Sequence, residues 1–262
     1  MNSFDENATY TNFATVYDEF MDDWPYEAWA GFVRNLLELY EVSGLDNASI
    51  AELGCGTGTV TEYFLKNGYK VEAIDLSQDM LDVAKDKCKQ YIGDGSLKLK
   101  CLDMRAFKLD KKVDAIISMC DSVNYLAEDG DLNKLFKCVA DNLNDGGVFI
   151  FDLKSLWLYE NAMADYTFSQ ENEDATYIWE NDFDEETRIN KYKLTLFIKN
   201  SDGTYNKHSE VHIQRAFDED DIYEAAKNTG LEVVEVFGQE PFEKPQEDDE
   251  RLFYVLQLQN GD

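Results

Sequence analysis

The sequence predicts a doubly wound α/β fold, with a seven-stranded, mostly parallel sheet and an antiparallel β insertion after the fifth strand. Three observations support this prediction. Short apolar strands alternate with amphipathic helices between residues 48 and 151. Glycine-rich or acidic turns follow several of these strands. From residue 155 the pattern changes to long stretches of alternating large and polar residues, as in antiparallel strands.

Two helices are expected ahead of the first strand. The first has apolar side chains at the i, i+3, i+4, i+7 spacing of one helix face, namely Phe13, Val16, Tyr17 and Phe20. The second begins at Pro25, a residue favoured at the first helical position, and is expected to stop near Gly44. We therefore expect residues 1–44 to form an N-terminal helical lid segment.

The next hundred residues alternate strand and helix. The expected strands are residues 48–54, 71–75, 97–101, 113–120 and 148–151. Helical spacing resumes after Gly58, and Ser77 has the position of an N-cap for the following helix. Because crossovers between parallel strands are nearly always right-handed, this order predicts a doubly wound sheet.

The remaining residues divide into an insertion and the end of the main sheet. Residues 155–216 are expected to form a three-stranded antiparallel meander, with strands at 176–183, 188–200 and 204–217. Strands at 231–237 and 251–258 then complete the sheet. Residues 45–154 and 217–262 are thus expected to form one domain, and residues 155–216 a subdomain that covers the acceptor.

Composition limits the classes of partner. The 262 residues include 24 Lys and Arg against 54 Asp and Glu, which gives a formal charge of −30. Binding to nucleic acid or to an anionic membrane requires clustered basic residues, so we expect neither partner. The start lacks the pattern of a signal peptide, no apolar run is long enough for a membrane span, and the five cysteines form no Cys-x-x-Cys pair. We expect a cytoplasmic protein with reduced thiols and no metal site.

A ligand site is expected where the carboxyl ends of the parallel strands meet. Gly54, Gly56 and Gly58 allow the backbone to approach a ligand closely. Asp75 ends the second strand 21 residues beyond Gly54, a separation at which a carboxylate can accept hydrogen bonds from both ribose hydroxyls. A dinucleotide fingerprint requires glycine at position 59, which is Thr59. The Glu52 carboxylate before the turn suits a ligand with an ammonium group or a sulfonium centre.

These residues resemble the class I S-adenosylmethionine-dependent methyltransferases, which have a Rossmann-like fold. The opening Tyr10-x-x-Phe13-Ala14-x-x-Tyr17-Asp18 and Pro25-Tyr-x-x-Trp29 look like the lead-in of a bacterial small-molecule-type branch of that family. The segment Glu52-Leu-Gly-Cys-Gly-Thr-Gly58 matches the first motif of that family, and Asp75 has the position of its ribose-binding acid. Asp103-Met104 matches the pair that frames the adenine. The resemblance implies S-adenosyl-L-methionine as cofactor. It implies cofactor contacts from Gly54, Cys55, Gly56, Gly58, Asp75, Asp103, Met104 and Cys120. We expect Glu52, Met80 and Tyr17 to complete the cofactor-binding set, with Tyr17 closing over the cofactor as part of the lid segment.

The acceptor site is expected beside this cofactor site. Methyl transfer from a sulfonium is an in-line displacement, so alignment and exclusion of water supply much of the acceleration. Asp121 and Tyr125 are the candidate groups for removing a proton from the acceptor. The favoured alternative for Asp121 is that it caps the turn after its strand. Asp121 and Asn124 lack a third ligand for a metal.

Further acceptor contacts are expected from Tyr10, Tyr125, His208 and His212. The alternative for the two histidines, four residues apart on one strand, is a polar row that faces solvent. Aromatic residues of the insertion either surround a cation or pack its core; they are Trp157, Tyr159, Tyr166, Tyr177 and Trp179.

The sequence favours transfer of a methyl group to a small-molecule or peptide acceptor. One alternative is a regulatory protein that binds S-adenosylmethionine without transferring its methyl group. Another is an NAD-linked oxidoreductase, which Thr59 and Glu52 disfavour. The sequence does not specify the acceptor or the oligomeric state.

Overall fold

The large sheet has the predicted doubly wound topology. The computed structural model describes residues 13–21, 25–42, 48–164 and 166–259. Its sheet order is β10-β11-β5-β4-β1-β2-β3. The strands are β1 (Ser49–Leu53), β2 (Lys70–Asp75), β3 (Leu97–Cys101), β4 (Val113–Ser118), β5 (Leu143–Lys154), β10 (Leu231–Phe237) and β11 (Arg251–Leu258). Only β11 runs antiparallel to its neighbours among these pairs, which confirms the mostly parallel sheet.

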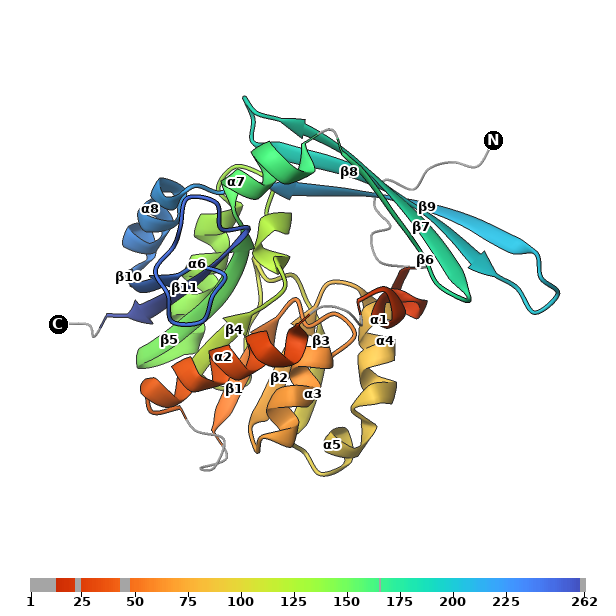
Figure 1. The fold of residues 1–262 in the computed structure, drawn as a ribbon. Helices are drawn as coiled ribbons and strands as arrows, with labels where there is room; N and C mark the ends of the chain where they lie inside the picture. Colours follow the sequence, from red (N-terminus) through yellow and green to blue (C-terminus); the bar gives the residue numbers. More distant parts are fainter. Residues whose placement is uncertain (1–12, 22–24, 43–47, 165, 260–262) are drawn as a thin grey trace.

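Helices cover both faces of this sheet (Figure 1). They are α2 (Tyr26–Leu39), α3 (Thr59–Lys66), α4 (Gln78–Lys87), α5 (Lys89–Gly93), α6 (Asp131–Asn142) and α8 (Glu219–Thr229). The adjacent β4 residues Ile116 and Ile117 belong to different apolar clusters, because successive side chains of a strand point to opposite faces. Ile116 packs in the cluster that contains Phe136 of α6, and Ile117 in the cluster that contains Phe64 of α3.

Side chains cap the N-termini of two helices of the main domain. The Ser77 side chain accepts a hydrogen bond from the Met80 amide and caps α4, as predicted. Asp218 forms a capping box with Asp221 at the start of α8. Helix α2 ends at Leu39, and the predicted stop near residue 44 lies outside the described residues.

The insertion is a four-stranded antiparallel sheet, so the expectation of three strands was wrong. Its strands are β6 (Thr167–Glu171), β7 (Ala175–Asp184), β8 (Ile189–Lys199) and β9 (Tyr205–Arg215), paired in that order. The additional strand β6 is short and polar, with little apolar alternation to indicate it. Its turn into β7 is held by the Asn172 side chain, which accepts hydrogen bonds from the Asp174 and Ala175 amides.

The insertion begins directly after β5, as predicted. The chain passes through α7 (Leu156–Leu158) and the short helix η4 (Tyr159–Met163) before entering β6. The long second sheet extends above the first, and the N-terminal α1 (Tyr17–Phe20) lies between it and α4 (Figure 1). Phe13 and Phe20 pack with Leu194 of β8, which joins the N-terminal segment to the insertion.

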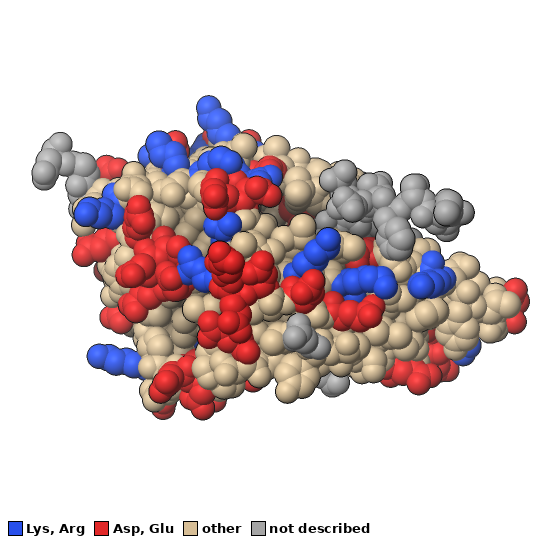
Figure 2. All heavy atoms as spheres, turned by 90° about the horizontal axis from the view of Figure 1, so that it is seen from above, with Lys and Arg blue, Asp and Glu red and all other residues tan. Residues whose placement is uncertain are grey.

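Seen from above, the molecule presents acidic side chains with basic ones among them (Figure 2). The acidic residues gather over the left half of this face. This mixed distribution accords with a chain in which acids outnumber bases by more than two to one. Among the described residues, no helix combines the length and apolarity that a bilayer crossing requires.

Candidate active site

The glycine loop between β1 and α3 is held close to neighbouring segments. The amides of Gly54 and Cys55 both donate to the Ile74 carbonyl, at 2.8 and 3.1 Å. Gly54 has φ of +69°, and a Cβ atom there would lie 2.5 Å from the Ser122 Oγ atom. A side chain at this position is therefore excluded both by backbone conformation and by contact.

Gly58 lies at the contact between α3 and α4. It precedes α3 with φ of +80°, and a Cβ atom there would lie 3.0 Å from the Ala84 Cβ atom. Gly58 does not line the pocket described below. It allows the start of α3 to pack closely against α4.

The Asp75 carboxylate is fixed at the carboxyl end of β2. Its Oδ2 atom accepts a hydrogen bond from the Gly56 amide, and its Oδ1 atom accepts one from the Ser77 amide, both at 2.8 Å. Burial raises the pKa of Asp75, while these amide hydrogen bonds act in the opposite direction. Each oxygen retains further acceptor capacity, so the carboxylate can receive two additional hydroxyl donors.

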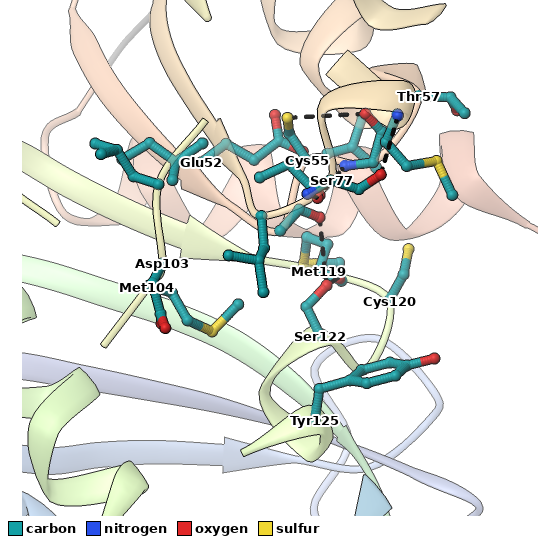
Figure 3. A pocket seen from close by; sticks show the side chains of 18 of the residues that line it. Glu52, Cys55, Thr57, Ser77, Asp103, Met104, Met119, Cys120, Ser122 and Tyr125 are labelled. Carbon is teal, nitrogen blue, oxygen red and sulfur yellow. Dashed lines mark hydrogen bonds between the residues drawn. The ribbon is translucent and has the colours of Figure 1, made fainter. Parts of the chain in front are cut away.

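A pocket of about 420 Å³ opens over this loop. Figure 3 shows that Glu52, Cys55 and Thr57, the Asp103-Met104 pair, and Cys120 and Tyr125 face one common space from different elements. Ten of the eleven residues predicted to bind the cofactor line this pocket: Glu52, Gly54, Cys55, Gly56, Asp75, Met80, Asp103, Met104, Cys120 and Tyr17. Other lining residues are absent from the predicted cofactor-binding set, including Tyr26, Thr57, Ser77, Arg105, Met119 and Ser122.

Glu52 is buried beneath the pocket, with 2% of its surface exposed. Its Oε2 atom accepts a hydrogen bond from the Thr61 hydroxyl at 2.5 Å. Burial, together with the negative charge of Asp75, raises the pKa of Glu52 to about 8. A cation placed in this pocket would favour the ionised form of Glu52.

Asp103 is held at the pocket wall by Arg105. The Arg105 Nη2 atom lies 2.6 Å from the Asp103 Oδ2 atom, and the Nη1 atom lies 2.6 Å from Asp131. Hydrogen bonds from Arg105 lower the pKa of Asp103. Its carboxylate is therefore ionised and oriented before any ligand arrives.

A second chamber of about 80 Å³ adjoins the first. Both are lined by Tyr17, Tyr26, Cys120 and Tyr125, which form the shared wall. The second chamber is mostly aromatic, and its other lining residues are Phe13, Phe20, Met21, Trp29, Asp121, Lys154, Tyr177, Trp179, Tyr192, Leu194, His212 and Arg251. We call it the aromatic chamber. It is built where the insertion sheet and the N-terminal segment meet the main sheet.

Asp121 does not have the surroundings of a base. Its carboxylate lies 3.0 Å from the Lys154 Nζ atom and 2.9 Å from the Arg251 Nη2 atom. The two cations lower the pKa of Asp121 despite its burial. Asp152 adds a second carboxylate, which bonds Arg251 and accepts from the Asp121 amide. Asp121 is therefore an ionised member of a buried charge network.

The two histidines of β9 have different environments. His212 is 1% exposed, and its Nδ1 atom is 3.1 Å from the Tyr125 hydroxyl. It lines the aromatic chamber, so the alternative of a solvent-facing row was wrong for His212. His208 shares that face of β9 but lines neither cavity.

The N-terminal segment is attached to the glycine loop. The Asp18 carboxylate accepts a hydrogen bond from the Thr57 hydroxyl at 2.6 Å and pairs with Lys87 at 2.7 Å. The hydroxyls of Tyr17 and Tyr26 are 3.2 Å apart in the shared wall. Tyr10, predicted to contact the acceptor, lies outside the described residues.

Aromatic residues of the insertion divide between chamber and core. Tyr177 and Trp179 line the aromatic chamber, whereas Tyr159 is fully buried and stacks on Phe183. Tyr166 is exposed. Within the described ranges, no group of three or more His, Cys, Asp or Glu side chains is arranged to hold a metal ion.

Residues 50–147 match a family model described as a methyltransferase domain. The "Putative methyltransferase YqeM" of Bacillus subtilis (strain 168) is 31% identical, over 95% of this chain and 96% of that protein. A dTDP-3-amino-3,4,6-trideoxy-alpha-D-glucopyranose N,N-dimethyltransferase of Streptomyces venezuelae is 31% identical, over 58% of this chain and 60% of that enzyme. The structure of an S-adenosylmethionine-dependent methyltransferase from Clostridium acetobutylicum superposes with a TM-score of 0.84 and 28% identity, covering 96% of this chain and 99% of that one.

Proposed function

The chain belongs to the S-adenosylmethionine-dependent methyltransferases, and from this premise we propose that it methylates a small molecule held in the aromatic chamber. The observation that carries this proposal is the shared wall. A donor in the larger pocket and an acceptor in the aromatic chamber would be separated only by Tyr17, Tyr26, Cys120 and Tyr125.

The larger pocket fits the donor. S-adenosylmethionine supplies a methyl group on a sulfonium, which is already an activated leaving group. We propose that Asp75 accepts hydrogen bonds from the ribose and that Asp103 and Met104 frame the adenine. The glycine loop provides a backbone surface for the amino-acid part, and Glu52 beneath it supplies negative charge once the bound cation favours its ionised form. The Gly54 position, where a Cβ atom would strike Ser122, supports a close backbone cradle.

The aromatic chamber fits a compact organic acceptor. Its ring-lined walls provide apolar surface, and its charged residues are already paired with one another. These walls would exclude water around the nucleophile and align it with the donor. The amino-sugar N,N-dimethyltransferase relative supports an amine as one acceptor class.

We also propose that three parts of the chain have different roles in the reaction. Residues 1–44 act as a lid, because Asp18 attaches this segment to the glycine loop and Tyr17 lines both cavities. Residues 45–154 and 217–262 bind the donor. Residues 155–216 select the acceptor, because the insertion sheet supplies Trp179, Tyr192 and His212 to the chamber.

A labelling experiment tests the proposed acceptor class. The purified protein is incubated with methyl-labelled S-adenosylmethionine and a bacterial extract separated into a low-molecular-weight filtrate and a protein retentate. We expect label in the filtrate. Label in the retentate alone would replace the small molecule with a peptide or protein acceptor. Donor binding without labelled product in either fraction would favour the regulatory alternative.

A chamber-filling variant tests the location of the acceptor. Met21→Trp adds a ring to the aromatic chamber, whereas Tyr205→Trp adds bulk on an exposed part of β9. We expect the first variant to lose transfer while its affinity for S-adenosylhomocysteine is unchanged, and the second to retain both. Full transfer by Met21→Trp would place the acceptor elsewhere.

A further inference from the structure

Tyr125 connects the shared wall to His212 and Glu210, two buried residues of β9. Its hydroxyl is 3.1 Å from the His212 Nδ1 atom and 2.5 Å from the Tyr192 hydroxyl. On the other side of the His212 ring, the Nε2 atom lies 3.4 Å from the Glu210 Oε2 atom. His212 and Glu210 are 1% and 3% exposed. A tyrosine, a histidine and a glutamate therefore form a continuous line from the shared wall into the protein.

We infer that Tyr125, His212 and Glu210 form a proton relay that removes a proton from the methyl acceptor. This inference rests on the proposed function, because it requires an acceptor in the aromatic chamber beside Tyr125. It also defines the acceptor class: the reacting group is an N–H or O–H group that must lose its proton at neutral pH. Tyr125 is the catalytic residue, since it reaches the acceptor, and Glu210 is a positioning residue.

Hydrogen-bond directions in the cluster support this role. A tyrosine hydroxyl donates one hydrogen bond and accepts up to two. When Tyr125 donates to the His212 Nδ1 atom, Tyr192 donates to the Tyr125 oxygen, and that oxygen retains one lone pair for the acceptor. This arrangement requires the His212 tautomer with its proton on Nε2, the atom nearest Glu210.

The transfer step is balanced in atoms and electrons. The lone pair of the acceptor nitrogen or oxygen forms a bond to the methyl carbon as the carbon–sulfur bond breaks, and that electron pair remains on sulfur. The acceptor proton moves to the Tyr125 oxygen while the Tyr125 proton moves to the His212 Nδ1 atom. The products are the methylated acceptor, S-adenosylhomocysteine and a His212 imidazolium, which later releases its proton to water.

The surroundings of His212 suit a group that starts neutral and then accepts a proton. The titratable groups that face it are Glu210 on its own strand, Tyr192 on β8, Tyr125 on η3 (Ser122–Tyr125) and Lys154 at the end of β5. Burial lowers the pKa of His212, Lys154 acts in the same direction, and Glu210 opposes them. The free imidazole is thus neutral at pH 7, and the Glu210 carboxylate stabilises the imidazolium when it forms.

Packing fixes the orientation of the relay. The His212 ring stacks on Tyr192 with centroids 4.7 Å apart and an interplanar angle of 5°, and Tyr192 stacks on Trp179. The second Glu210 oxygen accepts a hydrogen bond from the Phe13 amide at 3.3 Å. The N-terminal segment therefore helps to hold the glutamate against the histidine.

The chain has two histidines, which allows a direct spectroscopic test of the relay. In 15N-labelled protein saturated with S-adenosylhomocysteine, His208→Gln identifies the remaining imidazole signals as those of His212. We expect His212 at pH 7 to be neutral with its proton on Nε2. An Nδ1–H tautomer or an imidazolium would overturn the relay, because neither form can take the Tyr125 proton. This measurement does not depend on knowing the acceptor.

Rates complete the test, with the low-molecular-weight filtrate as the acceptor pool. The wild-type rate should rise with pH until His212 is neutral and then become constant. His212→Gln keeps an acceptor for the Tyr125 hydroxyl but cannot take its proton. It should lower kcat by about 10²- to 10⁴-fold and remove that pH dependence. Tyr125→Phe should match this loss, whereas Tyr223→Phe, on exposed α8, should not.

Donor affinity, measured beside the rates, distinguishes failure of the proposed relay from failure of the proposed function. Loss of S-adenosylmethionine binding in either relay variant would indicate a structural role and overturn the inference. Wild-type kcat and pH dependence in His212→Gln would also overturn it. Failure of the wild-type protein to methylate anything in the filtrate would instead refute the proposed function, and the tautomer of His212 would still decide whether the relay geometry exists.

Discussion

Replacing Glu52 with Gln is predicted to abolish a proton release that accompanies donor binding. The pKa of Glu52 is about 8, so at pH 7 about nine-tenths of the free protein carries a neutral Glu52. A donor with ammonium and sulfonium charges favours the ionised form, so binding should release roughly 0.9 proton. Glutamine retains an acceptor for the Thr61 hydroxyl but has no proton to release.

The same pKa gives the size of the affinity effect. Ionising Glu52 at pH 7 costs about 1.4 kcal/mol, a tenfold factor in the binding constant. Between pH 7 and pH 8 this linkage should tighten donor binding by roughly fivefold in the wild-type protein. The contribution disappears in Glu52→Gln.

Calorimetry at pH 7 in two buffers of different ionisation enthalpy measures the released proton directly. Glu62→Gln, a carboxylate on α3 outside the pocket, is the matched control and should release as much as the wild-type protein. S-adenosylhomocysteine, which retains the ammonium group but lacks the sulfonium, identifies which charge acts on Glu52. Equal heats in both buffers for the wild-type protein would refute the assignment of Glu52 to the donor's cationic part.

Further predictions concern the donor site, the lid and the charge network. Asp75→Ala should abolish measurable binding of S-adenosylmethionine in calorimetry, because it removes both the ribose acceptor and the partner of the Gly56 amide. Asp18→Ala should increase the dissociation rate of S-adenosylhomocysteine in stopped-flow measurements, because the proposed lid segment loses its hydrogen bond to Thr57. Asp121→Asn should lower the free energy of unfolding in urea by about 3–5 kcal/mol, because it leaves two buried cations short of a carboxylate. Glu52→Gln should be the more stable protein at pH 8 by about 4 kcal/mol, since the pKa of the folded wild-type residue exceeds its ordinary value of 4.5 and stability is lost as pH rises through that window.

Controls make these outcomes specific. Asp86→Ala removes an exposed carboxylate of α4 that does not line the pocket, and it should leave donor affinity intact. Unchanged donor affinity in Asp75→Ala would contradict the ribose assignment. If Asp121→Asn has the same free energy of unfolding as the wild-type protein, the buried charges of Lys154 and Arg251 do not need this carboxylate for stability. The difference in unfolding free energy between Glu52→Gln and the wild-type protein should be larger at pH 8 than at pH 5. The same difference at both pH values would contradict the raised pKa of Glu52.

The lining of the larger pocket was largely predictable because its residues follow from local sequence order. The carboxyl ends of parallel strands meet at one edge, so the glycine turn after β1 and Asp75 after β2 had to lie close together. Gly58 shows the limit of this reasoning. Glycine spacing indicates where the backbone needs conformational freedom. It does not reveal that the packing of α3 against α4 brings Ala84 so close that position 58 has no room for a side chain.

The acceptor side depended on contacts that sequence spacing does not encode. In the sequence alone, Asp121 has the position of a possible base. In the structure it contacts Lys154 of β5 and Arg251 of β11, and Arg251 is 130 positions away in the chain. His208 and His212 share one face of a strand, and only the register of β9 against β8 places His212 opposite Tyr192. The position of Tyr125 after β4 was the single local signal that pointed toward this cluster.

A crystal structure with S-adenosylhomocysteine bound would show whether the larger pocket holds the donor and faces its sulfur toward the aromatic chamber. We predict that the ribose hydroxyls donate hydrogen bonds to the Asp75 carboxylate and that the thioether sulfur faces the aromatic chamber between Cys120 and Tyr125. A ligand whose ribose lies away from Asp75, or whose sulfur points away from that chamber, would contradict it.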